Sequence, residues 1–229
     1  MIAFAACVGT PAKLAAYAAP GLRRVMEPDS VFAELTTDRS IHEAYNEALG
    51  HFADVPGLEA LVLLHEDTEL LDTDFCARVR ALLRDPSVAI AGAIGASGVR
   101  SLRWWEAAIA GRAAEPRGVV AGARAPCDVD SLDGLLLVLS PWAVRSLRCD
   151  TDRFTGFHGY DADLCFAARA AGRRVVVGDF EVFHHTKGGY GDEAAFAAAD
   201  AAFREKWSAS PNTATITASG AHAGPRAGP

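Results

Sequence analysis

Apolar positions along the chain fall into short continuous runs separated by segments with helical spacing. The apolar runs predict four buried strands in the first part of the chain, at residues 2–8, 31–35, 61–64 and 88–95. Residues 12–19 are rich in alanine and predict a short helix, which we expect to end at Pro20-Gly21. Together with a helix at residues 41–52, the order β-α-β-α-β predicts a parallel sheet with covering helices.

The helix at residues 41–52 has a recognisable start. Ser40 and Glu43 match a capping box, in which the serine oxygen binds the amide of the third helical residue and the acidic side chain reaches back to the cap. From Ile41 onwards, apolar residues recur at the spacing of one helix face. We therefore expect this helix to begin at Ile41.

The second part of the chain is predicted to hold further elements around a less regular segment. These are helices at residues 73–84, 142–147, 160–171 and 192–207, and strands at residues 127–139, 173–178 and 182–185. Residues 100–126 are the least regular, and they include Trp104 and Trp105. Because adjacent side chains point in different directions, we interpret one tryptophan as a core residue and the other as part of a cleft or a mobile loop.

Two local features complete the pattern. The Asp133-Gly134 pair interrupts an apolar run and predicts a bend or a close approach of the backbone. Residues 208–229 are rich in small residues and nearly uncharged, so we expect them to be mostly disordered.

Composition and charge narrow the class of protein. The 229 residues are enough for one large domain or two small ones, and half of them are hydrophobic. The formal net charge of −7 argues against nucleic-acid binding as the main function. The five cysteines are widely spaced and form no CxxC pair, which argues against a disulfide framework or a zinc site and fits a reducing cytosol.

No segment has the pattern of a signal peptide or a membrane span. Residues 1–8 lack a basic region before the apolar run, so we interpret them as a strand. The longest nearly apolar run, at residues 135–144, is far shorter than the roughly 20 residues that a spanning helix needs. We expect a cytoplasmic protein, whose association with a membrane would have to be peripheral.

Three polar clusters follow predicted strands or begin a predicted helix. They are His65-Glu66-Asp67, then His158 with Asp161 and Asp163, and finally His184-His185. In open α/β sheets, ligands collect where the strands end. Carboxylates with imidazoles could bind a divalent cation, for which Mg²⁺ and Mn²⁺ suit carboxylates best. A separate carboxylate could act as a general base.

Each cluster also has a purely structural interpretation. The first could be a solvated acidic turn after an ordinary strand. Asp161 and Asp163 could simply stabilise the start of their helix, where the dipole favours negative charge. The paired histidines could be one core residue beside one exposed residue. A shared site explains all three clusters together better than three separate structural causes do.

Several short motifs also follow one another in a defined order. They are Ala44-Tyr45-Asn46-Glu47-Ala48-Leu49, Leu63-Leu64-His65-Glu66-Asp67, Ala91-Gly92-Ala93-Ile94-Gly95, Asp133-Gly134, Gly156-Phe157-His158-Gly159-Tyr160-Asp161-Ala162-Asp163-Leu164-Cys165 and His184-His185. This set resembles the family-2 glycosyltransferases, over roughly residues 1–190. It is most similar to the branch with His-x-Asp in place of Asp-x-Asp.

The resemblance implies a GT-A fold, which is an α/β three-layer sandwich with a mostly parallel central sheet. It implies a single domain over residues 1–207, with a nucleotide-binding half at about residues 1–98 and an acceptor half at residues 99–207. The implied activity is transfer of a sugar from a nucleotide-diphosphate sugar to an acceptor hydroxyl, with inversion and with Mn²⁺ or Mg²⁺. The acceptor could be a glycan, a lipid-linked glycan or a small molecule.

The resemblance also implies roles for individual residues. Asp161 would be the catalytic base, with Asp163 as the alternative, and Asp67 would bind the cation together with His184 or His185. The implied contacts to the sugar nucleotide are Thr10, Asp38, Asn46, His65, Glu66, Asp133 and Trp105.

This sequence departs from the family pattern at three places. His65 stands where the wider family has an aspartate, Tyr160 stands where a glutamate precedes the catalytic aspartate, and Val8-Gly9-Thr10-Pro11 replaces the usual signature after the first strand. Two alternatives therefore stay open. One is a nucleotidyltransferase, although residues 9–13 match its basic glycine-rich loop poorly, and the other is a catalytically silent protein of the same fold that binds a sugar nucleotide or a partner.

Overall fold

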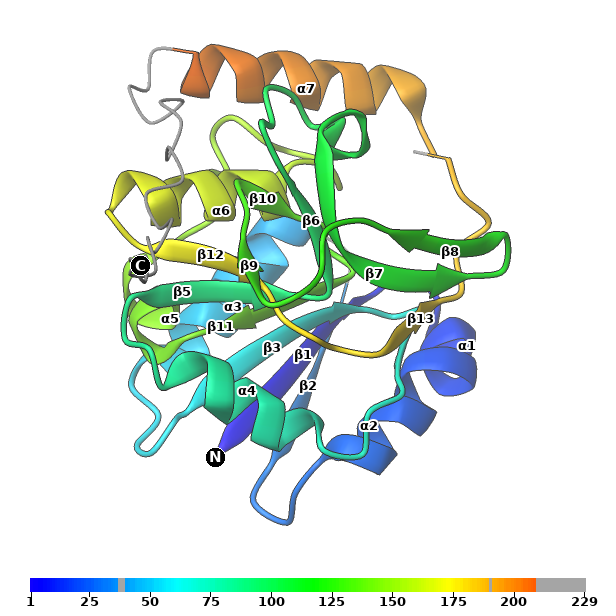
Figure 1. Cartoon of the computed structure of the whole chain (residues 1–229), viewed down its shortest axis with the longest axis vertical. Helices are drawn as coiled ribbons and strands as arrows, with labels where there is room; N and C mark the ends of the chain where they lie inside the picture. Colours follow the sequence, from blue (N-terminus) through cyan, green and yellow to red (C-terminus); the bar gives the residue numbers. More distant parts are fainter. Residues whose placement is uncertain (37–39, 190, 209–229) are drawn as a thin grey trace, which may run out of the picture.

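The computed structural model describes residues 1–36, 40–189 and 191–208. Figure 1 shows a central sheet with helices on both sides and helix α7 lying across one end. Asp38 and the tail expected to be disordered, apart from Ser208, lie outside the described residues.

The central sheet is mixed. Among the described residues it contains, in spatial order, β2 (Val31–Thr36), β1 (Ile2–Val8), β3 (Ala60–His65), β11 (Leu136–Leu139), β5 (Val88–Gly92), β12 (Arg174–Val177) and β9 (Cys127–Asp128). Strands β2, β1 and β3 are parallel, as the β-α-β-α-β order predicts. Strand β11 runs antiparallel to both β3 and β5, whereas β12 is parallel to β5.

Helices cover both faces of this sheet and make it the middle of three layers (Figure 1). Helices α3 (Ile41–Ala53), α5 (Pro141–Ser146) and α6 (Tyr160–Ala170) cover one face, and α2 (Ala19–Val25) and α4 (Phe75–Leu83) cover the other. Alternate residues of a strand pack into the hydrophobic cores on opposite faces of the sheet. In β1, Ala3 and Ala5 pack on the face covered by α3, α5 and α6, and Phe4 and Ala6 pack on the face covered by α2 and α4. The predicted α/β sandwich is confirmed, with a sheet that is not strictly parallel.

Helix α3 begins where the sequence predicts. The Ser40 side chain accepts a hydrogen bond from the amide of Glu43, and the Glu43 carboxylate accepts one from the amide of Ser40, which completes the capping box. The predicted end of α6 is confirmed as well, because Gly172 follows the helix with a φ of 74°.

The first helical segment does not end at Pro20-Gly21, and that prediction was wrong. It runs through α1 (Pro11–Lys13) and a π-helical turn (Leu14–Ala18) into α2, which continues to Val25. Proline normally breaks a helix because it lacks an N–H and crowds the preceding turn. Here the wider π turn precedes Pro20, so α2 resumes with Pro20 in its first turn, where no N–H is needed.

A second sheet stands beside the first. Among the described residues its strands, in order, are β10 (Ser131–Leu132), β6 (Ile94–Ser97), β7 (Ala108–Glu115), β13 (Val182–His184) and β4 (Thr68–Leu70), with β8 (Gly118–Ala121) paired to β7. The segment predicted to be least regular therefore forms the β7–β8 hairpin. Strand β7 consists largely of alanine and glycine, which favour strands weakly, so its conformation depends on pairing with β6.

Helix α7 (Glu193–Trp207) packs against α6 through Phe203, which lies beside Phe166, and its Phe196 is buried beside Trp105. It thereby closes the upper end of the molecule in Figure 1. None of the helices within the described residues is both long enough and apolar enough to cross a membrane.

Candidate active site

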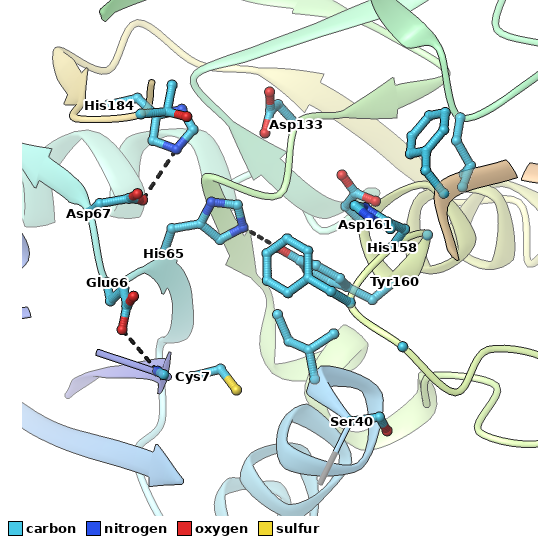
Figure 2. A pocket seen from close by; sticks show the side chains of 18 of the residues that line it. Cys7, Ser40, His65, Glu66, Asp67, Asp133, His158, Tyr160, Asp161 and His184 are labelled. Carbon is cyan, nitrogen blue, oxygen red and sulfur yellow. Dashed lines mark hydrogen bonds and ion pairs between the residues drawn. The ribbon is translucent and has the colours of Figure 1, made fainter. Parts of the chain in front are cut away.

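A cavity of about 830 Å³ opens where strands β1 and β3 end. Its lining includes the polar residues at the end of β3, the end of β13, the start of α6 and the turn that holds Asp133. Figure 2 shows these side chains converging on one space although they come from distant parts of the sequence. The three polar clusters of the sequence thus contribute to one pocket.

His65, Asp67 and His184 form a cluster with the chemistry of a cation site. One potential ligand atom from each residue lies within 4.8 Å of the others. Nε2 of His184 lies 3.3 Å from Oδ1 of Asp67, and all three side chains are partly buried. Two imidazoles and one carboxylate are ligands that divalent transition metals accept, so the residues present fit a bound cation.

The charge states of the cluster agree with that chemistry. Burial and the neighbouring His184 lower the pKa of His65 to about 3, so its ring is neutral at neutral pH. Burial opposes ionisation of Asp67, but its contact with His184 lowers the pKa of Asp67 to about 2. Burial likewise opposes a proton on His184, yet Asp67, Asp133 and Glu115 raise its pKa. The carboxylates that favour a proton there would also favour a metal cation on the deprotonated ring.

Tyr160 connects this cluster to the start of α6. Its hydroxyl lies 2.7 Å from Nε2 of His65 and donates a hydrogen bond of 2.9 Å to the carbonyl oxygen of Gly134. A β-carbon at position 134 would collide with that hydroxyl, so only glycine permits the contact. The close backbone approach predicted at Asp133-Gly134 is therefore confirmed.

Asp161 lies on the same wall of the pocket as Tyr160 (Figure 2). Its Oδ2 accepts a hydrogen bond of 3.0 Å from the amide of Gly134, and its Oδ1 accepts one of 2.8 Å from the amide of Ala162. Burial and the nearby carboxylate of Asp133 raise the pKa of Asp161 to about 7. A carboxylate with such a pKa can take up a proton under physiological conditions.

Glu66 organises the loop after β1. Its Oε2 accepts hydrogen bonds from the amides of Gly9, at 2.9 Å, and Thr10, at 2.7 Å. Lys13 lies beside it, with Nζ 3.8 Å from Glu66 and 3.7 Å from Asp67. Glu66 therefore lies at the pocket but uses one carboxylate oxygen to hold the loop, and Thr10 contributes its backbone to that contact.

Three other residues predicted to belong to the site make contacts elsewhere, namely Asn46, His185 and Asp163. Asn46 exchanges hydrogen bonds of 2.9 and 2.7 Å with the backbone of Cys149. His185 lies against Tyr17, with ring centroids 4.1 Å apart, and its Nε2 lies 3.2 Å from Oε2 of Glu69. None of these side chains is part of the cavity lining.

Asp163 is also turned away from the cavity. It is 1% exposed and accepts hydrogen bonds from Lys206, at 3.0 Å, and from Nε1 of Trp207, at 2.9 Å. Its surroundings are those of a residue that attaches α7 to α6.

Aromatic side chains also line the pocket. Trp104 and Trp105 both line it, so neither is purely a core residue, and their ring centroids lie 6.1 Å apart in an edge-to-face arrangement. Phe196 of α7 lies beside Trp105, with ring centroids 6.0 Å apart, whereas Phe157, which is 53% exposed, lies beside His65, with ring centroids 5.6 Å apart. Flat apolar surfaces of this kind suit the face of a sugar or another ring.

Sequence reasoning missed three residues of this site. Lys13 is the last residue of the short helix α1 after β1, where a lone lysine in an alanine-rich segment was the available signal. Glu115 of β7 lies 4.0 Å from Nδ1 of His184, and it falls in the segment predicted to be irregular. Tyr160 was noticed only as a departure from the family pattern, although it lines the pocket and contacts His65.

Comparison with known proteins identifies relatives over most of the chain. Residues 15–198 match the sequence model of a family described as "Glycosyltransferase like family". The streptomycin biosynthesis protein StrF of Streptomyces griseus is 30% identical over 191 residues, which cover 82% of this chain and 68% of StrF.

Two solved structures are similar in fold. One is the mannosyltransferase PcManGT from Pyrobaculum calidifontis, in complex with GDP-Man and Mn²⁺, with a TM-score of 0.55 and 16% identity over 82% of this chain and 58% of that one. The other is GalNAc-T7 with UDP, GalNAc and Mn²⁺, with a TM-score of 0.59 and 7% identity over 87% and 46% of the two chains. The predicted GT-A fold and the family resemblance are confirmed: the chain belongs to the glycosyltransferase-like family.

Proposed function

We propose that this protein transfers a sugar from a nucleotide-diphosphate sugar to an acceptor hydroxyl, with inversion and with the help of a divalent cation. The observation that carries the proposal is the placement of two complementary groups in one cavity. The cluster of His65, Asp67 and His184 lies on one side, and Asp161, with a pKa raised to about 7, lies on the other. A cation site and a general base are the two groups that such a displacement needs.

His65, Asp67 and His184 would hold the cation, and His185 would not, because its ring lies outside the cavity lining. When bound, the cation would neutralise the diphosphate and stabilise it as the leaving group. Two imidazoles make this ligand set softer than an all-carboxylate site, which favours Mn²⁺ over Mg²⁺. The presence of Mn²⁺ in the two similar structures is consistent with that choice.

Asp161 would accept the proton of the acceptor hydroxyl as its oxygen attacks the anomeric carbon and the bond to the diphosphate breaks. The amides of Gly134 and Ala162 fix the orientation of the carboxylate for that step. Asp163 would have a structural role, because Lys206 and Trp207 occupy its carboxylate.

Lys13 and the loop held by Glu66 would bind the nucleotide part of the donor, since Nζ of Lys13 lies 3.7 Å from Asp67 and 3.8 Å from Glu66. Asp133 would approach the donor sugar, because it lies between the cation cluster and Asp161 in Figure 2. Trp105 and the other aromatic residues would contact a sugar ring. In this arrangement residues 1–98 supply most of the nucleotide site, and residues 99–207 supply the base and the aromatic residues.

An Asp161→Asn variant tests the proposal. It keeps the size of the side chain but cannot accept the acceptor proton, so we expect transfer to fall by roughly 10²–10⁴-fold. Binding of the nucleoside diphosphate with Mn²⁺ should change little. The measurement is turnover of a panel of nucleotide-diphosphate sugars with candidate acceptors, and ¹H NMR of the product reports whether the anomeric configuration is inverted.

The same assays separate the alternatives. An unchanged rate in the Asp161→Asn variant would contradict the base assignment. Tight binding of a sugar nucleotide without transfer to any acceptor would favour a catalytically silent binding protein. Release of pyrophosphate from a nucleoside triphosphate and a sugar phosphate would favour a nucleotidyltransferase.

A further inference from the structure

We propose that Tyr160 is a positioning residue that holds the ring of His65 in one tautomer. In that tautomer Nε2 carries the proton, and the lone pair of Nδ1 faces the cation site shared with Asp67 and His184. The inference rests on the proposed cation site and adds a residue outside its ligand set.

The hydrogen-bond directions follow from a count of protons. The Tyr160 hydroxyl has one proton, and the carbonyl oxygen of Gly134, 2.9 Å away, can only accept. The hydroxyl therefore donates to Gly134. The second contact of the hydroxyl, 2.7 Å to Nε2 of His65, must then use a proton from the imidazole ring.

A neutral imidazole carries one proton, so a protonated Nε2 leaves Nδ1 with a free lone pair. Figure 2 shows Nδ1 of His65 on the side of the ring that faces His184, away from Tyr160. The two histidine rings have centroids 5.5 Å apart. The opposite tautomer would direct an N–H into the cation site and would remove the hydrogen bond to the Gly134 carbonyl.

The Tyr160 hydroxyl is fixed in place by its surroundings. The residue is 2% exposed, and its ring packs edge-to-face against Tyr45 at a centroid distance of 5.0 Å. Position 134 has no room for a side chain, so the hydroxyl reaches the Gly134 backbone directly. The contact is therefore built into the fold and does not depend on a flexible side chain.

Gly134 also forms hydrogen bonds with both Tyr160 and Asp161. Its carbonyl accepts from Tyr160, and its amide donates to Oδ2 of Asp161. A single backbone segment thus orients both a cation ligand, through Tyr160, and the proposed base. Groups that orient a metal ligand typically change metal affinity by 10–100-fold when they are removed.

The first test uses the unaltered protein. Long-range ¹H–¹⁵N correlation spectra of histidine-labelled protein distinguish the two tautomers, and a His65→Gln variant assigns the signals of this ring. We expect the Nε2–H form in the cation-free protein. A predominant Nδ1–H form would overturn the inference, whatever the variants do.

The second test measures Mn²⁺ binding to the full chain by electron paramagnetic resonance. Tyr160→Phe keeps the ring and removes the hydroxyl, and we expect it to weaken Mn²⁺ binding by 10–100-fold. In a His65→Ala background the same substitution should have no further effect, because Tyr160 acts through His65. Tyr17→Phe, which also loses one hydroxyl but lies beside His185, is the control and should bind as the unaltered protein does.

The outcomes separate this inference from the function on which it rests. Equal losses with and without His65, or an unchanged Mn²⁺ affinity in Tyr160→Phe, would overturn the positioning role and leave the cation site intact. Failure of the unaltered protein to bind Mn²⁺ would overturn the cation site and the inference with it. Circular dichroism shows whether each variant is folded. Where a variant does not fold, the ¹H–¹⁵N correlation spectrum of the unaltered protein alone decides whether His65 has the predicted tautomer.

Discussion

At the scale of single residues, the charge of Asp161 depends on its surroundings. Burial and Asp133 raise the pKa of Asp161 to about 7, so the residue is ionised above that pH and protonated below it. A general base acts only when ionised. We therefore predict that kcat/KM rises with pH, is half-maximal near pH 7 and levels off about one pH unit above that, as measured in initial-rate assays with saturating Mn²⁺.

The raised pKa of Asp161 also makes the stability of the folded protein depend on pH. Because the pKa of Asp161 is higher in the folded protein than in the unfolded chain, ionisation favours unfolding, and the folded state loses stability as pH rises from about 4 to 7. An Asp161→Asn variant lacks this loss. The difference in free energy of unfolding between variant and parent should therefore shift in favour of the variant by roughly 1–3 kcal/mol as pH rises over that range. A difference that does not change with pH would contradict the raised pKa of Asp161.

The sequence predicted polar clusters that line one pocket in the structure, but it could not choose between neighbouring residues within a cluster. His184 and His185 are adjacent on one extended segment, where consecutive side chains point to opposite faces. Only the pairing of β13 with β4 decides that His184 faces Asp67 while His185 faces Glu69. Asp161 and Asp163 lie two positions apart on a helix, roughly 200° around its axis, and the packing of α7 decides which of them faces the pocket.

At the scale of elements, the attachment of α7 depends on a buried carboxylate. Asp163 of α6 accepts hydrogen bonds from Lys206 and Trp207 at the end of α7. Lys206 would keep its contact of 2.7 Å with Asp150, but Nε1 of Trp207 would lose the acceptor of its hydrogen bond. We predict that Asp163→Ala lowers the free energy of unfolding by about 1–3 kcal/mol, measured by urea denaturation.

An exposed aspartate provides the matched control for this experiment. Asp152 lies on the surface before α6, and Asp152→Ala should leave stability within about 0.5 kcal/mol of the parent. Below its own melting temperature, the Asp163→Ala protein should keep far more transfer activity than Asp161→Asn. Full stability combined with complete loss of transfer would instead support a catalytic role for Asp163.

Elements with local signals could be predicted from the sequence, and elements fixed by distant contacts could not. Helix α3 carries its own start signal in Ser40 and Glu43, and its apolar face is continuous. Strand β7 has a composition that favours no element strongly, so its pairing with β6 was not visible. In α2, Gly21 lies against β4, where an added β-carbon would come within 2.5 Å of the Leu70 amide nitrogen, and that packing is not encoded locally.

At the scale of the whole molecule, the pocket draws on the full length of the fold. Its lining begins at Cys7, at the end of β1, and extends to Phe196 of α7. The cation cluster itself joins β3 to β13, which belong to different sheets. A ligand that contacts such a pocket binds the folded chain and not the unfolded one, because unfolding separates all of these residues.

Binding should therefore raise the melting temperature of the whole protein. At a ligand concentration of about 100 times Kd, the added stability is about 2.7 kcal/mol, which corresponds to roughly 5–10 °C for a chain of this size. We predict such a shift in differential scanning fluorimetry for one nucleoside diphosphate with Mn²⁺, reversed by EDTA. Asp67→Asn should abolish the Mn²⁺-dependent part, since it removes the only carboxylate among the three clustered ligands, whereas Asp152→Ala should retain it. No shift with any nucleoside diphosphate would contradict the nucleotide site, and a shift that EDTA leaves unchanged would contradict the cation.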